Sequence, residues 1–162
     1  MPAGLERFLL AHRGQHPDYR SAPTFAEALE DITSNDRKDG HWIWYAFPQI
    51  RLGQTPVSVH FSLSSADEAK AFLAHPELSA HLFALTHAVR EAAGRVGSVR
   101  GVVGADAAKL VSSLTLFEEL AADEPDPRLD GFLEDAGALL ERAEREGFPR
   151  CSRTLRFLAH GR

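Results

Sequence analysis

Apolar residues recur along this chain every three to four positions, which is the spacing of helices that bury one face. Alternation of apolar and polar residues, the pattern of a half-buried strand, does not extend into a convincing series. The pattern predicts an all-α fold with helices over about residues 5–11, 25–33, 66–74, 77–93, 99–103, 129–143 and 155–159, and one that contains Lys109 and runs to about residue 122.

Polar residues and helix breakers mark the ends of these segments. Thr24–Glu27 and Ser65–Glu68 have the capping-box pattern, in which a hydroxyl and a carboxylate reciprocally bind the first backbone N–H groups of a helix. Gly94 and Gly97 are expected to stop the helix over 77–93, and residues 52–56 to form a loop. We therefore predict one helical domain over residues 1–162, an orthogonal bundle of about six to eight helices with irregular loops.

Aromatic residues are concentrated in residues 41–49, which read His-Trp-Ile-Trp-Tyr-Ala-Phe-Pro-Gln and hold both tryptophans of the chain. Pro48 disfavours helix at Phe47, so we expect an extended or short helical segment that breaks there. In a short helical segment, at about 100° per residue, side chains two positions apart point to different sides. One of Trp42 and Trp44 is therefore expected in the core and the other beside a cleft.

A second stretch, residues 104–117, is the expected partner of residues 41–49. On a helix, Lys109 and Ser113 share an arc with Leu110, Leu116, Phe117 and Leu120, and Asp106 joins them if the helix reaches back that far. The arc leaves Ser112, Glu118 and Glu119 pointing away. Charged and polar groups among leucines need a partner or a polar cavity. Two interpretations follow: a buried Asp106–Lys109 pair with Ser113 bonded to the backbone, or a pocket wall where Lys109 and Ser113 hold an anionic or polyhydroxyl ligand.

Three further groups in the first stretch have both a structural and a functional interpretation. His41 has the chemistry of a general acid or base, or is hydrogen-bonded in place. Trp42, Trp44 and Tyr45 can stack against a ring, or form core. Gln49 can recognise an amide or base edge, or cap a neighbouring backbone group.

Composition restricts the function classes. A net charge of −5 argues against general binding of nucleic acids or anionic membranes. Neither a signal-peptide core nor an apolar run of membrane-spanning length is present, so we expect a soluble, cytoplasmic protein. His75, His81 and His87 lack metal-ligand spacing and are expected on the surface; no cofactor motif is found, and neither metal nor cofactor is predicted. Cys151, the single cysteine, is either incidental or a nucleophile whose thiolate is favoured by Arg150 and Arg153.

The pattern His-Trp-x-Trp-x-x-Phe-Pro-Gln, followed by Gly-x-Asp-x-x-Lys-Leu-x-Ser-Ser-x-Thr-Leu-Phe, resembles the bacterial domain-of-unknown-function family 1810 (DUF1810). Residues 65–78 and 147–158 fit the same family, so the resemblance covers about Leu5 to Leu158. It implies a mostly helical single domain and no established activity. Where the family often has an Asp before the last Thr-Leu, this chain has Cys151-Ser152-Arg153.

Two hypotheses of function remain. In the first, a pocket between the two stretches binds a nucleotide-like or sugar-phosphate ligand through Trp42, Trp44, Gln49 and Ser113. If that pocket catalyses a metal-independent hydrolysis or transfer, His41 or Asp106 acts as acid or base and Lys109 stabilises charge. In the second, the protein is a non-enzymatic interaction or structural module whose motifs are folding core. A cleft that touches both stretches favours the first hypothesis, and a solid core favours the second.

Overall fold

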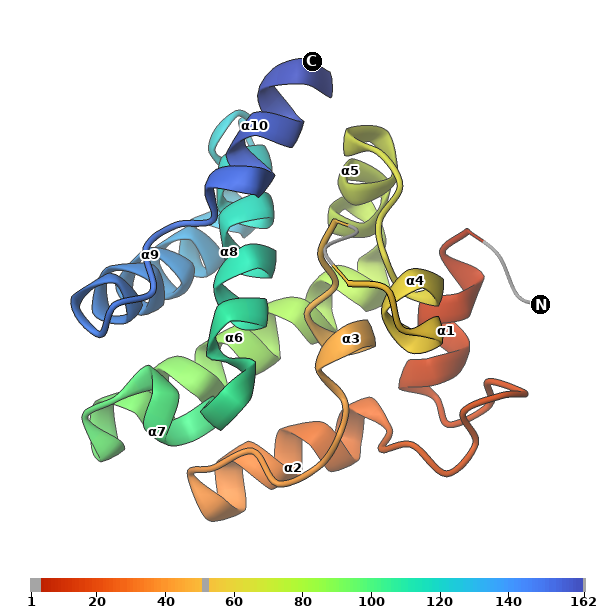
Figure 1. Cartoon of the computed structure of the whole chain (residues 1–162), viewed down its shortest axis with the longest axis horizontal. Helices are drawn as coiled ribbons and strands as arrows, with labels where there is room; N and C mark the ends of the chain where they lie inside the picture. The colour runs from red at the N-terminus through yellow and green to blue at the C-terminus, as the bar shows by residue number, and fades with distance from the viewer. Residues whose placement is uncertain (1–3, 51–52, 162) are drawn as a thin grey trace.

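The computed structural model describes residues 4–50 and 53–161, which are predominantly helical (Figure 1). Within these ranges, β structure is limited to one isolated parallel bridge between Ile50 and Leu63, so the all-α expectation is confirmed. The helices are α1 (Glu6–His12), α2 (Phe25–Asn35), α3 (Ile43–Ala46), α4 (Pro56–His60), α5 (Ala66–Ala74), α6 (Pro76–Val96), α7 (Val99–Val103), α8 (Ala107–Ala122), α9 (Asp130–Arg145) and α10 (Ser152–Gly161).

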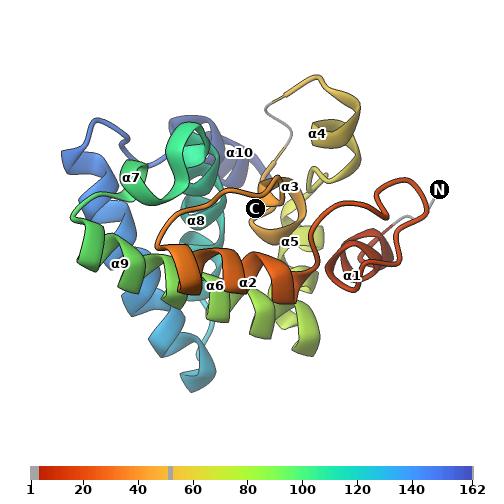
Figure 2. The same cartoon turned by 90° about the horizontal axis from the view of Figure 1, so that it is seen from below.

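Helix α6 packs against helices from both halves of the chain. It lies between α2 and α9, which flank it as seen in Figure 2, and it also packs against α5 and α7. Helix α8 runs across the direction of α6 in Figure 1 and packs against α5, α7, α9 and α10. The apolar faces of these helices meet in a connected hydrophobic core.

The two predicted capping boxes differ in outcome. At α2 both bonds form: the Thr24 hydroxyl accepts from the Glu27 N–H at 3.1 Å, and the Glu27 carboxylate accepts from the Thr24 N–H at 3.0 Å. At α5 the Ser65 hydroxyl accepts from the Glu68 N–H at 3.0 Å, but the Glu68 carboxylate binds the Ser64 N–H and Arg7 instead. The second box is therefore only half formed, because a buried arginine competes for its carboxylate.

Glycine ends α6 at one of the two predicted positions. Gly97 has φ 84°, the left-handed conformation that glycine adopts without steric cost, and it closes the helix. Gly94 lies inside α6, so the expectation that it stops the helix is wrong. A helix-interior glycine costs only about 1 kcal/mol, which tertiary packing readily offsets.

Helix α8 is buried around most of its circumference. Ser112, which was expected to point away from the core, is only 5% exposed, and that expectation is wrong because several helices surround α8. Glu118, also expected to point away, is half-buried and pairs with Arg150. The Thr115 hydroxyl donates to the Val111 carbonyl at 2.7 Å, which satisfies a polar group inside this buried helix.

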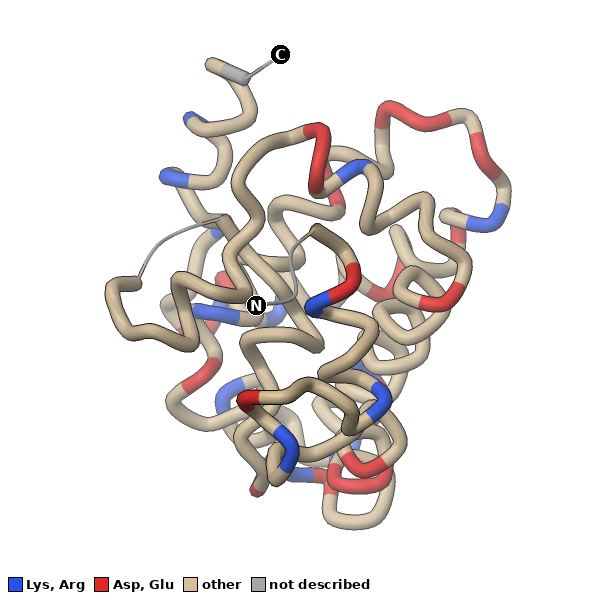
Figure 3. The backbone as a smooth tube through the Cα atoms, turned by 90° about the vertical axis from the view of Figure 1, so that its right-hand side faces the viewer, with Lys and Arg blue, Asp and Glu red and all other residues tan. Residues whose placement is uncertain are grey.

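Of the loop expected over residues 52–56, residue 52 lies outside the described residues, and Pro56 already belongs to α4, whose first turn is capped by the Thr55 hydroxyl. Within the described residues, no helix has the length and apolar character needed to cross a membrane. Figure 3 shows lysines and arginines interspersed with aspartates and glutamates along the described backbone. This mixture agrees with a chain whose net charge of −5 is small for its length.

Candidate functional site

Asp31, on α2, holds the loop that leads into residues 41–49. One of its carboxylate oxygens accepts hydrogen bonds from the Asp39 N–H at 2.9 Å, the Gly40 N–H at 2.8 Å and the Trp42 indole N–H at 3.0 Å. Burial alone would raise the pKa of Asp31, but these hydrogen bonds hold it below its ordinary value. The carboxylate thus remains ionised and fixes the position of Trp42.

The two tryptophans lie in different environments. Trp42 is fully buried, and Trp44 is half-buried. Each ring faces a lysine: the Lys38 ammonium lies 5.0 Å from the Trp42 ring centroid, and the Lys109 ammonium lies 5.2 Å from that of Trp44. Both distances are within the range of cation–π attraction. The expectation that one of the two tryptophans belongs to the core is confirmed, whereas a cleft beside the other, Trp44, stays a prediction.

Asp106 joins the two stretches because it binds both lysines. One oxygen lies 2.6 Å from the Lys38 ammonium and the other 3.0 Å from that of Lys109. Burial would raise the pKa of Asp106, but hydrogen bonds and charge from the two lysines lower it. The predicted i, i+3 pair of Asp106 and Lys109 is therefore present, and Lys38 is a partner that sequence analysis missed.

Charge in this cluster, which comprises Lys38, Asp106 and Lys109, is unbalanced. Two ammonium groups share one carboxylate, so the cluster carries a net positive charge. The Lys38 side chain is 5% exposed and also donates to the Gly40 carbonyl at 2.6 Å. The Lys109 side chain is 34% exposed, and among the described residues its ammonium donates only to Asp106. Lys109 therefore keeps donors that an approaching group can use.

Ser113 lies one helical turn beyond Lys109, so the two side chains emerge on the same face of α8. Its hydroxyl is completely buried and has no hydrogen-bond partner among the described residues. The expected bond from Ser113 to the backbone is absent there. An unsatisfied buried hydroxyl costs about 1–3 kcal/mol, which makes Ser113 an exception that needs an explanation.

The remaining predicted site residues lie at opposite extremes of exposure. His41 is exposed, and Gln49 is 5% exposed. The Gln49 backbone carbonyl accepts from the Leu63 N–H at 2.9 Å, which holds residues 49–50 against the segment before α5. Among the described residues, neither the His41 imidazole nor the Gln49 amide has a hydrogen-bond partner. Neither side chain is thus tied to the Lys38–Asp106–Lys109 cluster.

A hollow of about 360 Å³ lies beside the first stretch, lined by α2, Gly40 and Trp42. No residue of 104–117 lines this hollow. This hollow is therefore not the expected cleft between the two stretches, which meet through the Lys38–Asp106–Lys109 cluster and the contact between Lys109 and Trp44.

Cys151 precedes α10, and its thiol lies among polar groups. Burial raises its pKa, but the Ser112 and Thr154 hydroxyls and the Thr154 and Arg153 backbone N–H groups outweigh burial and lower it. Of the two arginines expected to favour the thiolate, Arg150 binds Glu118 at 2.8 Å instead, and Arg153 acts through its backbone N–H. Hydrogen bonds from α8 and from the start of α10, rather than guanidinium charge, therefore favour the thiolate.

Histidines form two close pairs around α1. The Nδ1 atoms of His12 and His81 are 2.8 Å apart, and the Nε2 atoms of His16 and His60 are 2.8 Å apart. His81, expected on the surface, is half-buried and stacks on Phe25 with 3.7 Å between ring centroids. Within the described residues, no group of three or more His, Cys, Asp or Glu side chains is arranged to hold a metal ion.

Fold and contacts together define a helical protein in which an aromatic segment meets a central helix through a shared carboxylate. The chain belongs to the family described as "Protein of unknown function (DUF1810)", whose sequence profile matches residues 2–135. The crystal structure of the conserved hypothetical protein Rv1873 from Mycobacterium tuberculosis is similar: the two chains are 36% identical, with a TM-score of 0.69. The similarity covers 98% of this chain and 99% of that one. No curated protein matches the chain.

Proposed function

We propose that this protein binds a small anionic molecule, of the nucleotide-like or sugar-phosphate class, at the face shared by Trp44 and Lys109. The observation that carries the proposal is the unbalanced cluster, in which Lys38 and Lys109 share the single carboxylate of Asp106. A partly exposed ammonium with unused donors attracts phosphate or carboxylate oxygens. The excess charge is local, because the chain as a whole carries −5.

Trp44 supports a ligand that carries a flat or ring-shaped group. Its half-buried ring lies beside the Lys109 ammonium, so a ring stacked on Trp44 would bring an attached anionic group close to that ammonium. Stacking of a base on an aromatic side chain contributes about 1–3 kcal/mol and tolerates different bases. Ser113 lies on the same face of α8, and its completely buried, unpaired hydroxyl would gain a partner if the side chains that cover it move when a ligand binds.

Binding is better supported than catalysis by Asp106. A carboxylate held between two ammonium groups, with a pKa below its ordinary value, is a poor proton acceptor and serves better as an anchor for the lysines. His41 is exposed and has no described partner to orient it. A metal-independent hydrolase or transferase reaction at this face would have to take its acid or base from His41.

A second function is favoured by a different observation. Trp42, Phe47 and Gln49 are buried, so much of residues 41–49 contributes to the folding core. This burial favours a non-enzymatic interaction or structural module whose motifs mainly stabilise the fold. The two functions differ in a measurable way, because only the first requires a saturable small-molecule site beside Lys109.

The test is a thermal-shift and calorimetric screen of nucleoside phosphates and sugar phosphates, each beside its dephosphorylated counterpart. We expect phosphate-dependent binding to the native chain. Lys109→Met should weaken it at least tenfold, equivalent to about 1.4 kcal/mol. Arg20→Met removes one exposed positive charge from the loop before α2 and serves as the matched control. Absence of any phosphate-dependent ligand, or equal weakening by both variants, would contradict the proposal and favour the interaction module.

The same variant separates the structural and functional roles of Lys109. Asp106 keeps Lys38 when Lys109 loses its charge, so the carboxylate is not left unpaired. The Lys109 side chain is also a third exposed, and such pairs contribute about 1 kcal/mol or less. We therefore expect urea denaturation to show that Lys109→Met lowers the unfolding free energy by less than about 1 kcal/mol. A loss of 3 kcal/mol or more, about what breaking a buried pair costs, would make Lys109 a structural residue.

A further inference from the structure

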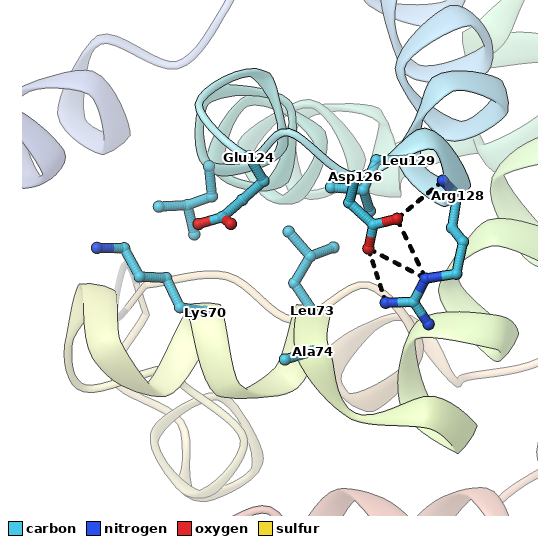
Figure 4. A pocket seen from close by; sticks show the side chains of 8 residues that line it. Lys70, Leu73, Ala74, Glu124, Asp126, Arg128 and Leu129 are labelled. Atoms are coloured by element: carbon cyan, nitrogen blue, oxygen red, sulfur yellow. Dashed lines mark hydrogen bonds and ion pairs between the residues drawn. The ribbon is translucent and has the colours of Figure 1, made fainter.

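A second hollow lies away from the first site, between α5 and the connection that joins α8 to α9 (Figure 4). Its volume is about 190 Å³, and Leu73, Leu120 and Leu129 form its apolar floor. These leucines are 6%, 2% and 4% exposed, so they are fixed in the core and present only an edge to the hollow.

One end of the hollow carries two opposite charges that have no partner among the described residues. Lys70 of α5 and Glu124 of the α8–α9 connection both line it, and Figure 4 shows the Glu124 carboxylate on the same side of the hollow as the Lys70 ammonium. No hydrogen bond or ion pair joins either side chain to another described residue. The other two lysines of the chain, Lys38 and Lys109, both hold Asp106.

The far end of the hollow is lined by Asp126 and Arg128, whose opposite charges bind each other. The Arg128 guanidinium binds the Asp126 carboxylate at 2.7 and 3.0 Å, and the Arg128 backbone N–H donates to the same carboxylate at 3.0 Å. Figure 4 shows this pair on the opposite side of Leu73 from Lys70. The hollow therefore has an end whose charges are unpaired among the described residues, an apolar middle, and an end whose charges are paired with each other.

We infer that this hollow binds a free aliphatic amino acid as its zwitterion. The ligand ammonium meets Glu124, its carboxylate meets Lys70, and its side chain lies on the three leucines. Both ligand charges are on one carbon, which matches two opposite protein charges at one end of an apolar floor. The volume of about 190 Å³ equals that of about six water molecules at 30 Å³ each and is below the range of drug-sized sites. The hollow is therefore of a size for a small ligand such as a single amino acid.

The inference is independent of the proposed function, because the two sites share no residue. L-Leucine is the probe, compared with N-acetyl-L-leucine, which lacks the ammonium, and L-leucinamide, which lacks the carboxylate. NMR titration of the native chain should give saturable shifts at the amides of Leu73, Leu120 and Glu124 with leucine. Each analogue should bind at least tenfold more weakly, equivalent to about 1.4 kcal/mol.

Variants assign each charge to its partner. Lys70→Met should weaken the binding of leucine at least tenfold. It should leave the binding of leucinamide unchanged, since leucinamide has no carboxylate for Lys70 to bind. Glu124→Gln should weaken the binding of leucine and of leucinamide. It should leave the binding of N-acetyl-leucine unchanged, since that analogue has no ammonium for Glu124 to bind. Glu144→Gln, which removes an exposed carboxylate of α9, is the control and should change none of the three. Leucine without saturable binding below about 10 mM, or analogues that bind as well as leucine, would overturn the inference.

Discussion

Trp42 and Trp44 are two positions apart, yet their side chains contribute differently to stability. Trp42 is completely buried, and its indole N–H is bound by Asp31 at 3.0 Å. Trp44 is half-buried and contacts the Lys109 ammonium on one face. The first side chain is thus a part of the core, whereas the second lies at the boundary between core and solvent.

Alanine substitution should separate the two residues. Trp42→Ala removes a buried ring and one of the three hydrogen bonds to one Asp31 oxygen, so we expect a loss of about 3–5 kcal/mol in unfolding free energy. Trp44→Ala should cost less than about 2 kcal/mol, because part of its surface is already in water. Urea denaturation of both variants measures the difference. Equal and large losses would show that both tryptophans are core and would weaken the proposed ligand site.

Residue-level prediction succeeded where the partners are close in sequence. The Asp106–Lys109 pair follows from helical spacing, and it is present at 3.0 Å. Asp31 and Lys38 were missed because each binds a residue that only the fold brings near. Lys38 lies in a polar connection, and nothing in the local sequence shows that its ammonium is buried against Asp106. Because these contacts are long-range, helical periodicity alone does not indicate them.

At the scale of elements, the sequence located most helices but not their surroundings. The segment predicted over 25–33 is α2, Phe25–Asn35, and the one over 77–93 is α6, Pro76–Val96. The short α4, Pro56–His60, has too few residues for a periodic signal. Ser112 was assigned to solvent because a single apolar arc was assumed for α8, whereas a central helix is covered on several sides.

Arg7 connects three elements and gives an element-scale prediction. From α1 it donates to the His60 carbonyl at the end of α4 and to the Ser62 carbonyl, each at 2.8 Å. It also binds the Glu68 carboxylate of α5 at 2.8 Å while only 6% exposed. Arg7→Met leaves three carbonyls, that of Gly4 among them, and a half-buried carboxylate without this donor, so we expect a loss of about 3 kcal/mol or more in unfolding free energy.

A matched control is available on the same side of the fold. Arg13, which directly follows α1, binds Glu77 of α6, but this pair is exposed. Arg13→Met should therefore cost about 1 kcal/mol or less. Hydrogen exchange should show α4 and the start of α5 opening more often in the Arg7 variant than in the Arg13 variant. Similar melts and similar exchange in the two variants would mean that Arg7 does not hold these elements together.

The stability of the whole molecule should depend on pH through the paired histidines. The His12 Nε2–H donates to the Tyr45 carbonyl at 2.7 Å, so the His12 Nδ1 accepts from the His81 Nδ1–H. Likewise the His16 Nδ1 accepts from the Asp18 N–H, so the His16 Nε2–H donates to His60. On His12, His16 and His60 the nitrogen without a proton already accepts a hydrogen bond, so a proton added there breaks that bond. The Nε2 of His81 has no hydrogen-bond partner among the described residues.

Burial is the main cause that lowers the pKa of all four histidines, and it lowers that of His12 from 6.5 to about 4. Near His12 and His81, the nearby Glu77 charge raises both pKa values, but this does not offset burial. In the unfolded chain these imidazoles become protonated near pH 6.5, whereas in the folded chain they become protonated only at a lower pH. Protons thus favour the unfolded state, and stability that is fully present above pH 6.5 falls as the pH is lowered.

We expect the unfolding free energy to decrease between pH 6.5 and about 4, with His12 alone contributing on the order of 3 kcal/mol. Asp31 and Asp106 do not interfere in most of this window, because their lowered pKa values affect stability only near and below the ordinary value of 3.8. Urea melts at a series of pH values measure the slope, and NMR titration of the imidazole protons assigns it to His12. His160→Gln, which removes an exposed histidine of α10, should leave the slope unchanged. A free energy that stays level across the window would mean that the pairs accept protons in the folded chain as readily as in the unfolded one.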